Sequence, residues 1–246
     1  MTPVERIQLN LLAKSERRLL NWICARLPAW VKPDQLTALG FTGSCISSAG
    51  YVLSNWSAAW LWMAIAGYFI NWFGDSLDGS LARFRKTERP EYGYFIDHSV
   101  DSFANMILVV GIGLSPFVEL RVAMFGLVGY LLMSIHTFLA ARVMGEFKLT
   151  YLSGGPTELR LILIAMTLAM LKLGAAPFFE TGFSVFDAFV AVFSVILISL
   201  FVFQTVQSAR LLLKVKHPAT PQHPPHVVPL IQPSVLPDRA PAQIRN

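Results

Sequence analysis

The sequence predicts an all-α, polytopic integral membrane protein, because its composition and its apolar stretches exclude an ordinary soluble domain. Of its 246 residues, 54% are hydrophobic and 14% are charged, whereas the charged fraction of soluble domains is nearer to about 25%. Six apolar stretches are each long enough to cross the roughly 30 Å of hydrocarbon in a bilayer. We therefore predict six transmembrane helices, which cover residues 35–54, 57–83, 94–114, 120–141, 158–176 and 186–209.

Composition also divides the chain into three parts. We predict an amphipathic juxtamembrane helix over residues 1–30, a membrane domain over 31–214 and a Pro-rich disordered cytoplasmic tail over 215–246. In the first part, apolar residues recur at roughly helical spacing, with Lys14, Arg17 and Arg18 between two apolar groups. Such a helix either lies on an anionic leaflet or docks on the protein's own cytoplasmic surface, and both can hold together.

The distribution of basic residues predicts the orientation in the membrane. If the six stretches span it, 18 of the 20 Lys and Arg residues fall on one side, and only Arg121 and Lys172 fall on the other. Cytoplasmic segments carry such an excess of cations. We therefore expect both termini to face the cytoplasm, and we expect the chain in the inner (plasma) membrane of a bacterium.

Four aspartates lie at the ends of two of the longest apolar stretches. A carboxylate in or beside hydrocarbon costs several kcal/mol or is neutralised by a shifted pKa, so four together need a compensating charge such as a bound cation. On α-helices, Asp75 and Asp78 share one face, and Asp97 and Asp101 share a face of the next helix. Two antiparallel helices could aim all four into one gap. Oxygen ligands with only His98 nearby suit Mg²⁺, Mn²⁺ or Ca²⁺, and four carboxylates can hold a metal pair.

Small residues and an arginine accompany the first two aspartates. Gly79 and Ala82 lie on the same helix face as Asp75, where missing side chains leave room for a ligand to approach the backbone. Arg83 could supply a planar donor for phosphate oxygens. The pattern is therefore compatible with a ligand that approaches the backbone beside the cation.

Together, these residues form a pattern of eight positions that resembles the signature of the CDP-alcohol phosphotransferases, the membrane enzymes that make phospholipids. The pattern reads Asp75-x2-Asp78-Gly79-x2-Ala82-Arg83, then nine residues, then Gly93-x3-Asp97-x3-Asp101. The segment from Lys32 to Thr37 is similar to the Pro-Asn-x-x-Thr/Ser opening of the family's first membrane helix, with Asp34 in place of the usual Asn.

The resemblance implies a metal-dependent displacement of CMP from a CDP-alcohol by a hydroxyl acceptor, with Mg²⁺ or Mn²⁺ as a pair of ions. It implies that the metal ligands are Asp75, Asp78, Asp97 and Asp101, and that Asp101 is also the candidate base that takes the proton of the acceptor. Physical reasoning alone does not separate these two roles of Asp101. The residues that the resemblance places around the nucleotide are Gly79, Ala82, Arg83, Gly93, Thr37 and Asp34.

The sequence leaves the substrates open. The donor and acceptor are either CDP-diacylglycerol with a small polar alcohol, or a CDP-amino-alcohol with diacylglycerol. A phosphorylated acceptor should need extra cations, for which Arg142, Lys148 and Arg160 are candidates by location. Membrane lipid is an expected partner and nucleic acid is not, and homodimers are usual in the resembling family.

Two other classes of function compete with an enzyme. A divalent-cation or proton-coupled transporter would carry ionisable residues along its path toward the far side, yet the distal halves of these helices carry essentially none. An inactive scaffold would keep the fold and lose the site, and the complete aspartate set argues against it.

Overall fold

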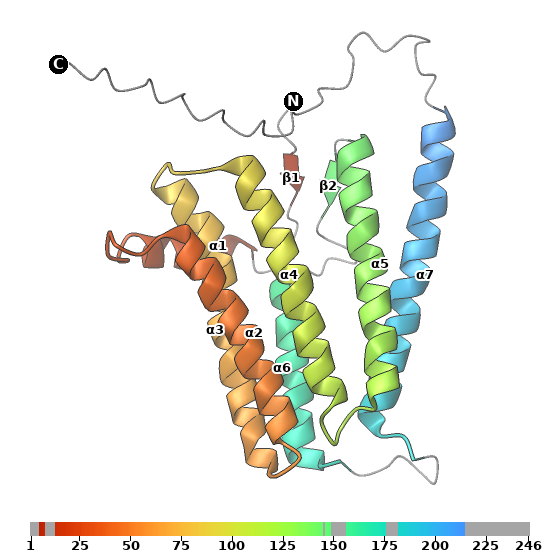
Figure 1. Cartoon of the computed structure of the whole chain (residues 1–246). Coiled ribbons are helices and arrows are strands. Elements are labelled where there is room, and N and C mark those ends of the chain that lie inside the picture. The colour runs from red at the N-terminus through yellow and green to blue at the C-terminus, as the bar shows by residue number, and fades with distance from the viewer. Residues whose placement is uncertain (1–4, 8–12, 145, 149–155, 176–181, 215–246) are drawn as a thin grey trace, which may run out of the picture.

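The computed structural model describes residues 5–7, 13–144, 146–148, 156–175 and 182–214, and its architecture is helical (Figure 1). Its described elements are one short helix, six long helices, a single 3-10 turn and a pair of three-residue strands. The helices are α1 (Ala13–Cys24), α2 (Pro33–Leu53), α3 (Leu61–Phe84), α4 (Pro90–Gly113), α5 (Leu120–Met144), α6 (Pro156–Leu173) and α7 (Val185–Lys214). The turn η1 is Ala58–Trp60, and the strands are β1 (Glu5–Ile7) and β2 (Glu146–Lys148).

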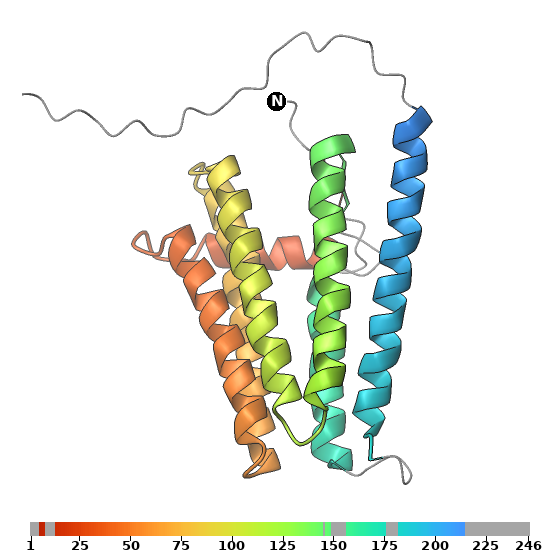
Figure 2. The ribbon, with the colours of Figure 1, turned by 45° about the vertical axis from the view of Figure 1, so that its right-hand side comes forward.

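The six long helices form an up-and-down bundle. Helices α2 and α3 lie side by side at one edge, α5 and α7 lie at the other, and α4 and α6 lie between them (Figures 1 and 2). Helix α1 crosses the bundle roughly at right angles near the end where α2, α4 and α6 begin (Figure 2). Each of the six predicted apolar stretches coincides with one of these long helices.

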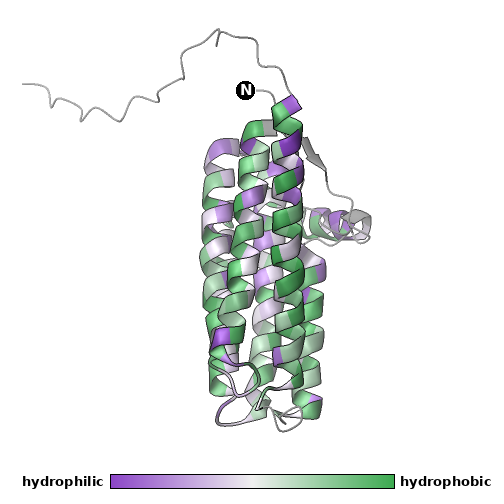
Figure 3. Ribbon diagram, turned by 90° about the vertical axis from the view of Figure 1, so that its right-hand side faces the viewer, coloured by the Kyte–Doolittle hydropathy of each residue, from purple (hydrophilic) through white to green (hydrophobic). Residues whose placement is uncertain are grey.

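Four of the long helices, α2, α4, α5 and α7, have the length and apolar composition of membrane-spanning segments. Hydrophobic residues cover most of the length of the α5 and α7 side in Figure 3. The other two fall outside this group: α3 contains Asn71, Asp75 and Asp78, and α6 contains Glu158 and Arg160. The four apolar helices support an integral membrane protein.

The backbones of α2 and α3 lie in close contact. A Cβ atom built at Gly43 would lie 2.3 Å from the backbone nitrogen of Asn71, and one built at Gly74 would lie 2.3 Å from that of Gly40. Small residues at matching positions let two membrane helices approach this closely and gain dispersion contacts along their length. The approach fixes the height of Asp75 and Asp78 on α3 against the start of α2.

A buried chain of hydroxyl groups joins α6 to the same pair of helices. The Tyr51 hydroxyl lies 2.5 Å from Thr167 Oγ1 and 3.1 Å from the Tyr68 hydroxyl, and Thr167 donates to the Leu163 carbonyl at 2.7 Å. Each of these three hydroxyl groups has a hydrogen-bond partner, as buried polar groups in an apolar core generally do. These hydroxyl groups lie within the main hydrophobic core, which also contains the fully buried Met170.

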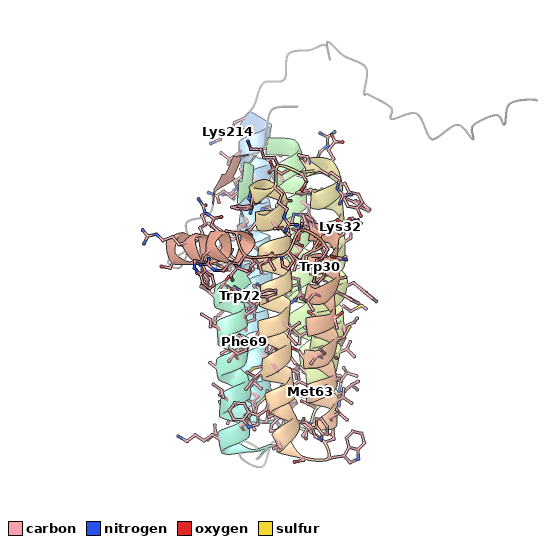
Figure 4. The ribbon with its side chains drawn as sticks, turned by 90° about the vertical axis from the view of Figure 1, so that its left-hand side faces the viewer. Trp30, Lys32, Met63, Phe69, Trp72 and Lys214 are labelled. Atoms are coloured by element: carbon pink, nitrogen blue, oxygen red, sulfur yellow. The ribbon has the colours of Figure 1, made fainter. Side chains whose placement is uncertain are left out.

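Helix α1 docks on α3 through its apolar face. Leu20 and Cys24 of α1 are buried against Leu77 and Leu81 of α3 in a second core cluster. Burial raises the pKa of the Cys24 thiol, so the thiol stays protonated and acts as a packing residue. The region where α1 crosses the bundle lies close to the level of Trp72 (Figure 4).

The predicted all-α class is confirmed, and the two three-residue strands β1 and β2 are a small addition to it. They pair in parallel with Glu5 opposite Glu146 and Ile7 opposite Lys148. The first 30 residues are therefore not one helix: a strand precedes the short helix α1. A strand of three residues is too short to show the alternating hydropathy of a β-strand. Its partner also lies far away in the sequence, with Glu5 opposite Glu146. The hydropathy pattern therefore did not predict these strands. The predicted disordered tail, 215–246, lies outside the described residues.

We expect Gly43→Ala to lower the thermal midpoint of the detergent-solubilised protein, because its Cβ would press on the backbone of α3. Overpacking of this kind costs typically about 1–3 kcal/mol. Gly93→Ala is the matched control, since a Cβ there meets nothing within 4 Å. Thermal unfolding, followed by intrinsic fluorescence, measures both midpoints. Equal thermal midpoints for Gly43→Ala and Gly93→Ala would contradict the expectation.

Candidate metal centre and active site

The four predicted metal ligands gather between α3 and α4. Asp75, Asp78 and Asp101 line one small pocket of about 10 Å³, a volume that suits a water molecule or an ion rather than a nucleotide. Asp97 lies beside this pocket, one turn from Asp101 on α4, and its charge acts on both Asp78 and Asp101. Antiparallel α3 and α4 thus bring together two pairs of carboxyl groups that are about 20 residues apart in the sequence.

His98 belongs to the same cluster. One ligand atom from each of Asp97, His98 and Asp101 lies within 4.8 Å of the others, and His98 Nδ1 is 3.5 Å from Asp97 Oδ2. The imidazole stacks on Phe138, with 5.0 Å between ring centroids, and meets the edge of Tyr94 at 4.4 Å. Sequence reasoning named His98 only as a neighbour, because the pattern of four aspartates explained a site without it.

Thr37 holds the buried carboxylate of Asp78. The Thr37 hydroxyl donates to Asp78 Oδ2 at 2.7 Å, and the backbone N–H of Gly79 donates to Asp78 Oδ1 at 2.5 Å. One hydrogen bond to each oxygen fixes the plane of the carboxylate. The resemblance placed Thr37 near the nucleotide, whereas in the structure its hydroxyl orients a candidate metal ligand.

Arg160 is the cation that the structure adds to the cluster. Its guanidinium pairs with Asp75 through Nη2 and donates from Nε to Asn71 Oδ1 at 2.7 Å. Both side chains of the ion pair are largely buried. Of the three cations considered for a phosphorylated acceptor, Arg160 is beside the aspartates, Arg142 is in the last turn of α5, and the side chain of Lys148 lies outside the described residues.

The other basic residues near this end have structural partners. Arg85 donates to the backbone carbonyls of Leu27 and Pro28 at 3.0 and 2.8 Å, and it also reaches the Val31 carbonyl. It therefore anchors the segment between α1 and α2 to the end of α3. Arg85 is one of the 18 Lys and Arg residues expected on one side of the membrane, and these bonds give it a positional role as well.

Asp34 pairs with Arg89 rather than lining the aspartate pocket. Arg89 Nη2 donates to Asp34 Oδ1 at 2.5 Å, and both side chains are about half exposed. This hydrogen bond raises the pKa of Arg89, which keeps its charge. The pair joins the start of α2 to the turn between α3 and α4. The acidic side chain at position 34 is therefore the ion-pair partner of the basic side chain at position 89.

The small residues of the pattern lie on the same side of α3 and in the first turn of α4. Arg83 lies over Gly79, where a built Cβ would be 3.3 Å from Arg83 Nη1, and Arg83 Nη2 donates to Ser80 Oγ at 3.3 Å. Ala82 is half-buried. Around Gly93, a built Cβ would meet nothing within 4 Å, so the first turn of α4 is open.

The donor set fits a hard divalent cation. Four carboxyl groups and one guanidinium meet at the cluster, so negative charge exceeds positive charge in a poorly hydrated place. Such an excess is costly unless a further cation is bound or carboxyl groups take up protons. Carboxylate oxygens are the ligands of Mg²⁺ and Mn²⁺. The residues that would hold such ions are Asp75, Asp78, Asp97 and Asp101.

Curated relatives include synthases and a phosphotransferase. Archaetidylinositol phosphate synthase of Methanothermobacter thermautotrophicus is 29% identical over 136 residues, which cover 54% of this chain and 65% of that protein. Cholinephosphotransferase 1 of Gallus gallus is 30% identical over 97 residues, 37% of this chain and 29% of that protein. Phosphatidylinositol phosphate synthase of Cutibacterium acnes is 33% identical over 92 residues, 37% of this chain and 41% of that protein.

These matches span less than two thirds of each relative's own length. A broader match comes from the sequence pattern of a whole family, which covers residues 30–207 and therefore α2 to α6 and most of α7. The pattern includes every helix that contributes a residue to the aspartate pocket. The chain belongs to the CDP-alcohol phosphatidyltransferase family.

Proposed function

We propose that the protein is a phospholipid-synthesising transferase that moves a substituted phosphoryl group from a CDP-alcohol to a hydroxyl acceptor and releases CMP. The observation that carries the proposal is the gathering of two carboxyl pairs from α3 and α4, three of which line one small pocket while Asp97 lies beside it. Family membership supports the same chemistry. It gives no support to the transporter alternative.

The membrane placement is part of the proposal. Helices α3 and α6 run alongside the four apolar helices, so we infer six spans, with α1 lying at the interface and the aspartates near the cytoplasmic end. Arg121 and Lys172 lie at the opposite end of the bundle, at the start of α5 and the end of α6. The excess of cations at the end with the aspartates supports a cytoplasmic site and cytoplasmic termini.

The residues of the chain divide the chemical tasks. Asp75, Asp78, Asp97 and Asp101 would hold a pair of Mg²⁺ or Mn²⁺ ions, which when bound stabilise negative charge on phosphoryl oxygens and on the departing CMP. Asp101 also accepts the proton of the acceptor hydroxyl as its oxygen bonds to the donor's phosphorus and the bond to CMP breaks. Thr37 keeps Asp78 in a fixed orientation.

The nucleotide would lie over the open part of this end. Gly79, Ala82 and Gly93 leave space beside α3 and the first turn of α4, and Arg83 carries donors for phosphate oxygens. Asp34, with its partner Arg89, lies at the start of α2 within reach of a ligand that enters there.

The acceptor remains a choice between substrate classes. Two of the relatives carry "inositol phosphate" in their names and one is a cholinephosphotransferase. Arg160 is a buried cation beside the aspartates, as a phosphorylated acceptor would require. A phosphorylated polyol with CDP-diacylglycerol is therefore the first pair to test, and CDP-choline with diacylglycerol is the second.

Purified protein with Mg²⁺ should release CMP from one of these donors, and only when the matching acceptor is present. Chelation with EDTA should abolish release, and added Mg²⁺ or Mn²⁺ should restore it, because the carboxylate cluster would otherwise lack its cations. Chromatographic measurement of CMP tests this. No CMP from any donor, together with metal-dependent ion flux in vesicles, would overturn the proposal.

Asp101→Asn should lower kcat by about a hundredfold to ten-thousandfold, the usual contribution of general-base catalysis. The amide has nearly the same shape but does not take up the proton, so we expect the thermal midpoint to stay close to that of the wild type. Glu119→Gln is the matched control, because Glu119 is at the far end of the bundle with Arg121. Full activity of Asp101→Asn would remove this carboxylate from the mechanism.

Thr37→Val should raise the Mg²⁺ concentration for half-maximal activity by about tenfold or more, as is typical when a residue that orients a metal ligand is lost. Thr37→Ser keeps the hydroxyl that donates to Asp78 and should behave like the wild type. A Mg²⁺ titration of CMP release measures both. Equal Mg²⁺ dependence of Thr37→Val and Thr37→Ser would contradict this role of the hydroxyl.

A further inference from the structure

A single carboxylate oxygen on the crossing helix α1 joins three elements of the bundle. Glu16 Oε1 accepts from Trp72 Nε1 at 2.9 Å, from Ser76 Oγ at 3.5 Å and from Thr157 Oγ1 at 2.8 Å. Trp72 and Ser76 belong to α3, and Thr157 is in the first turn of α6. Glu16 itself is half-buried.

The residues that Glu16 contacts are sequence neighbours of the metal centre. Trp72 directly follows Asn71, and Ser76 directly follows Asp75. Asn71 and Asp75 both line the aspartate pocket. Thr157 lies three positions before Arg160, which is one helical turn. Arg160 in turn bonds Asn71 and Asp75. The hydrogen bonds therefore close a ring that runs from α1 to α6, from α6 to α3 and back to α1.

Docking of α1 does not account for this arrangement. The apolar contacts of Leu20 and Cys24 with α3 already hold the helix in place. Taking a carboxylate partly out of water costs free energy, which three donors on one oxygen offset. The specific result of the three bonds is that the first turn of α6 is held at a fixed height against the Asp75 turn of α3.

We propose that Glu16 is a positioning residue for the metal centre: it fixes α6 against α3 so that Arg160 and Asp75 keep their places. This inference rests on the proposed function. Its basis is hydrogen bonding rather than ion pairing, because the three donors are neutral groups that meet the same oxygen. An amide oxygen at that place would serve equally, and an apolar side chain of similar size would not.

The experiment compares Glu16→Leu, Glu16→Gln and wild type in two measurements. The first is the Mn²⁺ dependence of the thermal midpoint without substrate, which reports metal binding directly. The second is the dependence of CMP release on Mg²⁺ and on the donor. We expect Glu16→Leu to need about tenfold more metal in both titrations, as for other residues that act through a ligand, and Glu16→Gln to match wild type. Glu119→Leu, at the opposite end of the bundle, is the control.

Each outcome decides the matter. A Glu16→Leu protein that melts at a lower temperature but has the wild-type metal dependence would overturn the positioning role and leave only a structural one. If Glu16→Leu does not fold, Thr157→Val removes the α6 bond alone and should shift the metal dependence, with Thr157→Ser unchanged. A wild type that neither binds Mn²⁺ nor releases CMP refutes the proposed function and this inference together. A wild type that does both, with no shift in the variants, refutes this inference alone.

Discussion

The close backbone contact between α2 and α3 is the constraint on which the site depends. Gly43 and Gly74 leave no room for a Cβ at the interface, so the relative height of the two helices has little freedom. That height decides whether the Thr37 hydroxyl reaches Asp78 across 41 residues of sequence. A shift of one helical turn, about 5.4 Å, would deprive the buried Asp78 carboxylate of the Thr37 hydrogen bond.

Charge sets the second constraint, because several carboxyl groups share one end of an apolar bundle. Three arrangements stabilise these carboxyl groups. Asp78 accepts two hydrogen bonds, and Asp75 forms an ion pair with Arg160. The third is the cluster of Asp97, His98 and Asp101, which has the composition of a cation site. Each arrangement uses a different element. The helices must therefore assemble completely before the carboxyl groups are all stabilised, which ties the fold to the chemistry.

Hydropathy located all six long helices, and helical spacing placed Asp75 with Asp78 and Asp97 with Asp101, because both properties are local in the sequence. The contacts of Arg160 and Glu16 were not predictable in this way. Arg160 meets Asp75 across 85 positions, and Glu16 meets Thr157 across 141. A charged residue near a helix end has an adequate local explanation in membrane topology, so only the three-dimensional neighbourhood separates a positional role from that general one.

Ionisable residues of the long helices gather near the end of the bundle where α1 crosses. Helix α3 supplies Asp75 and Asp78, α4 supplies Asp97 and Asp101, and α6 supplies Arg160. Helices α5 and α7 pair with each other at the other edge, and no described residue of theirs lines the aspartate pocket. Ionisable groups within apolar helices are costly, and here they lie where they form the site and its supports. The location of these groups among the helices therefore follows the location of the chemistry.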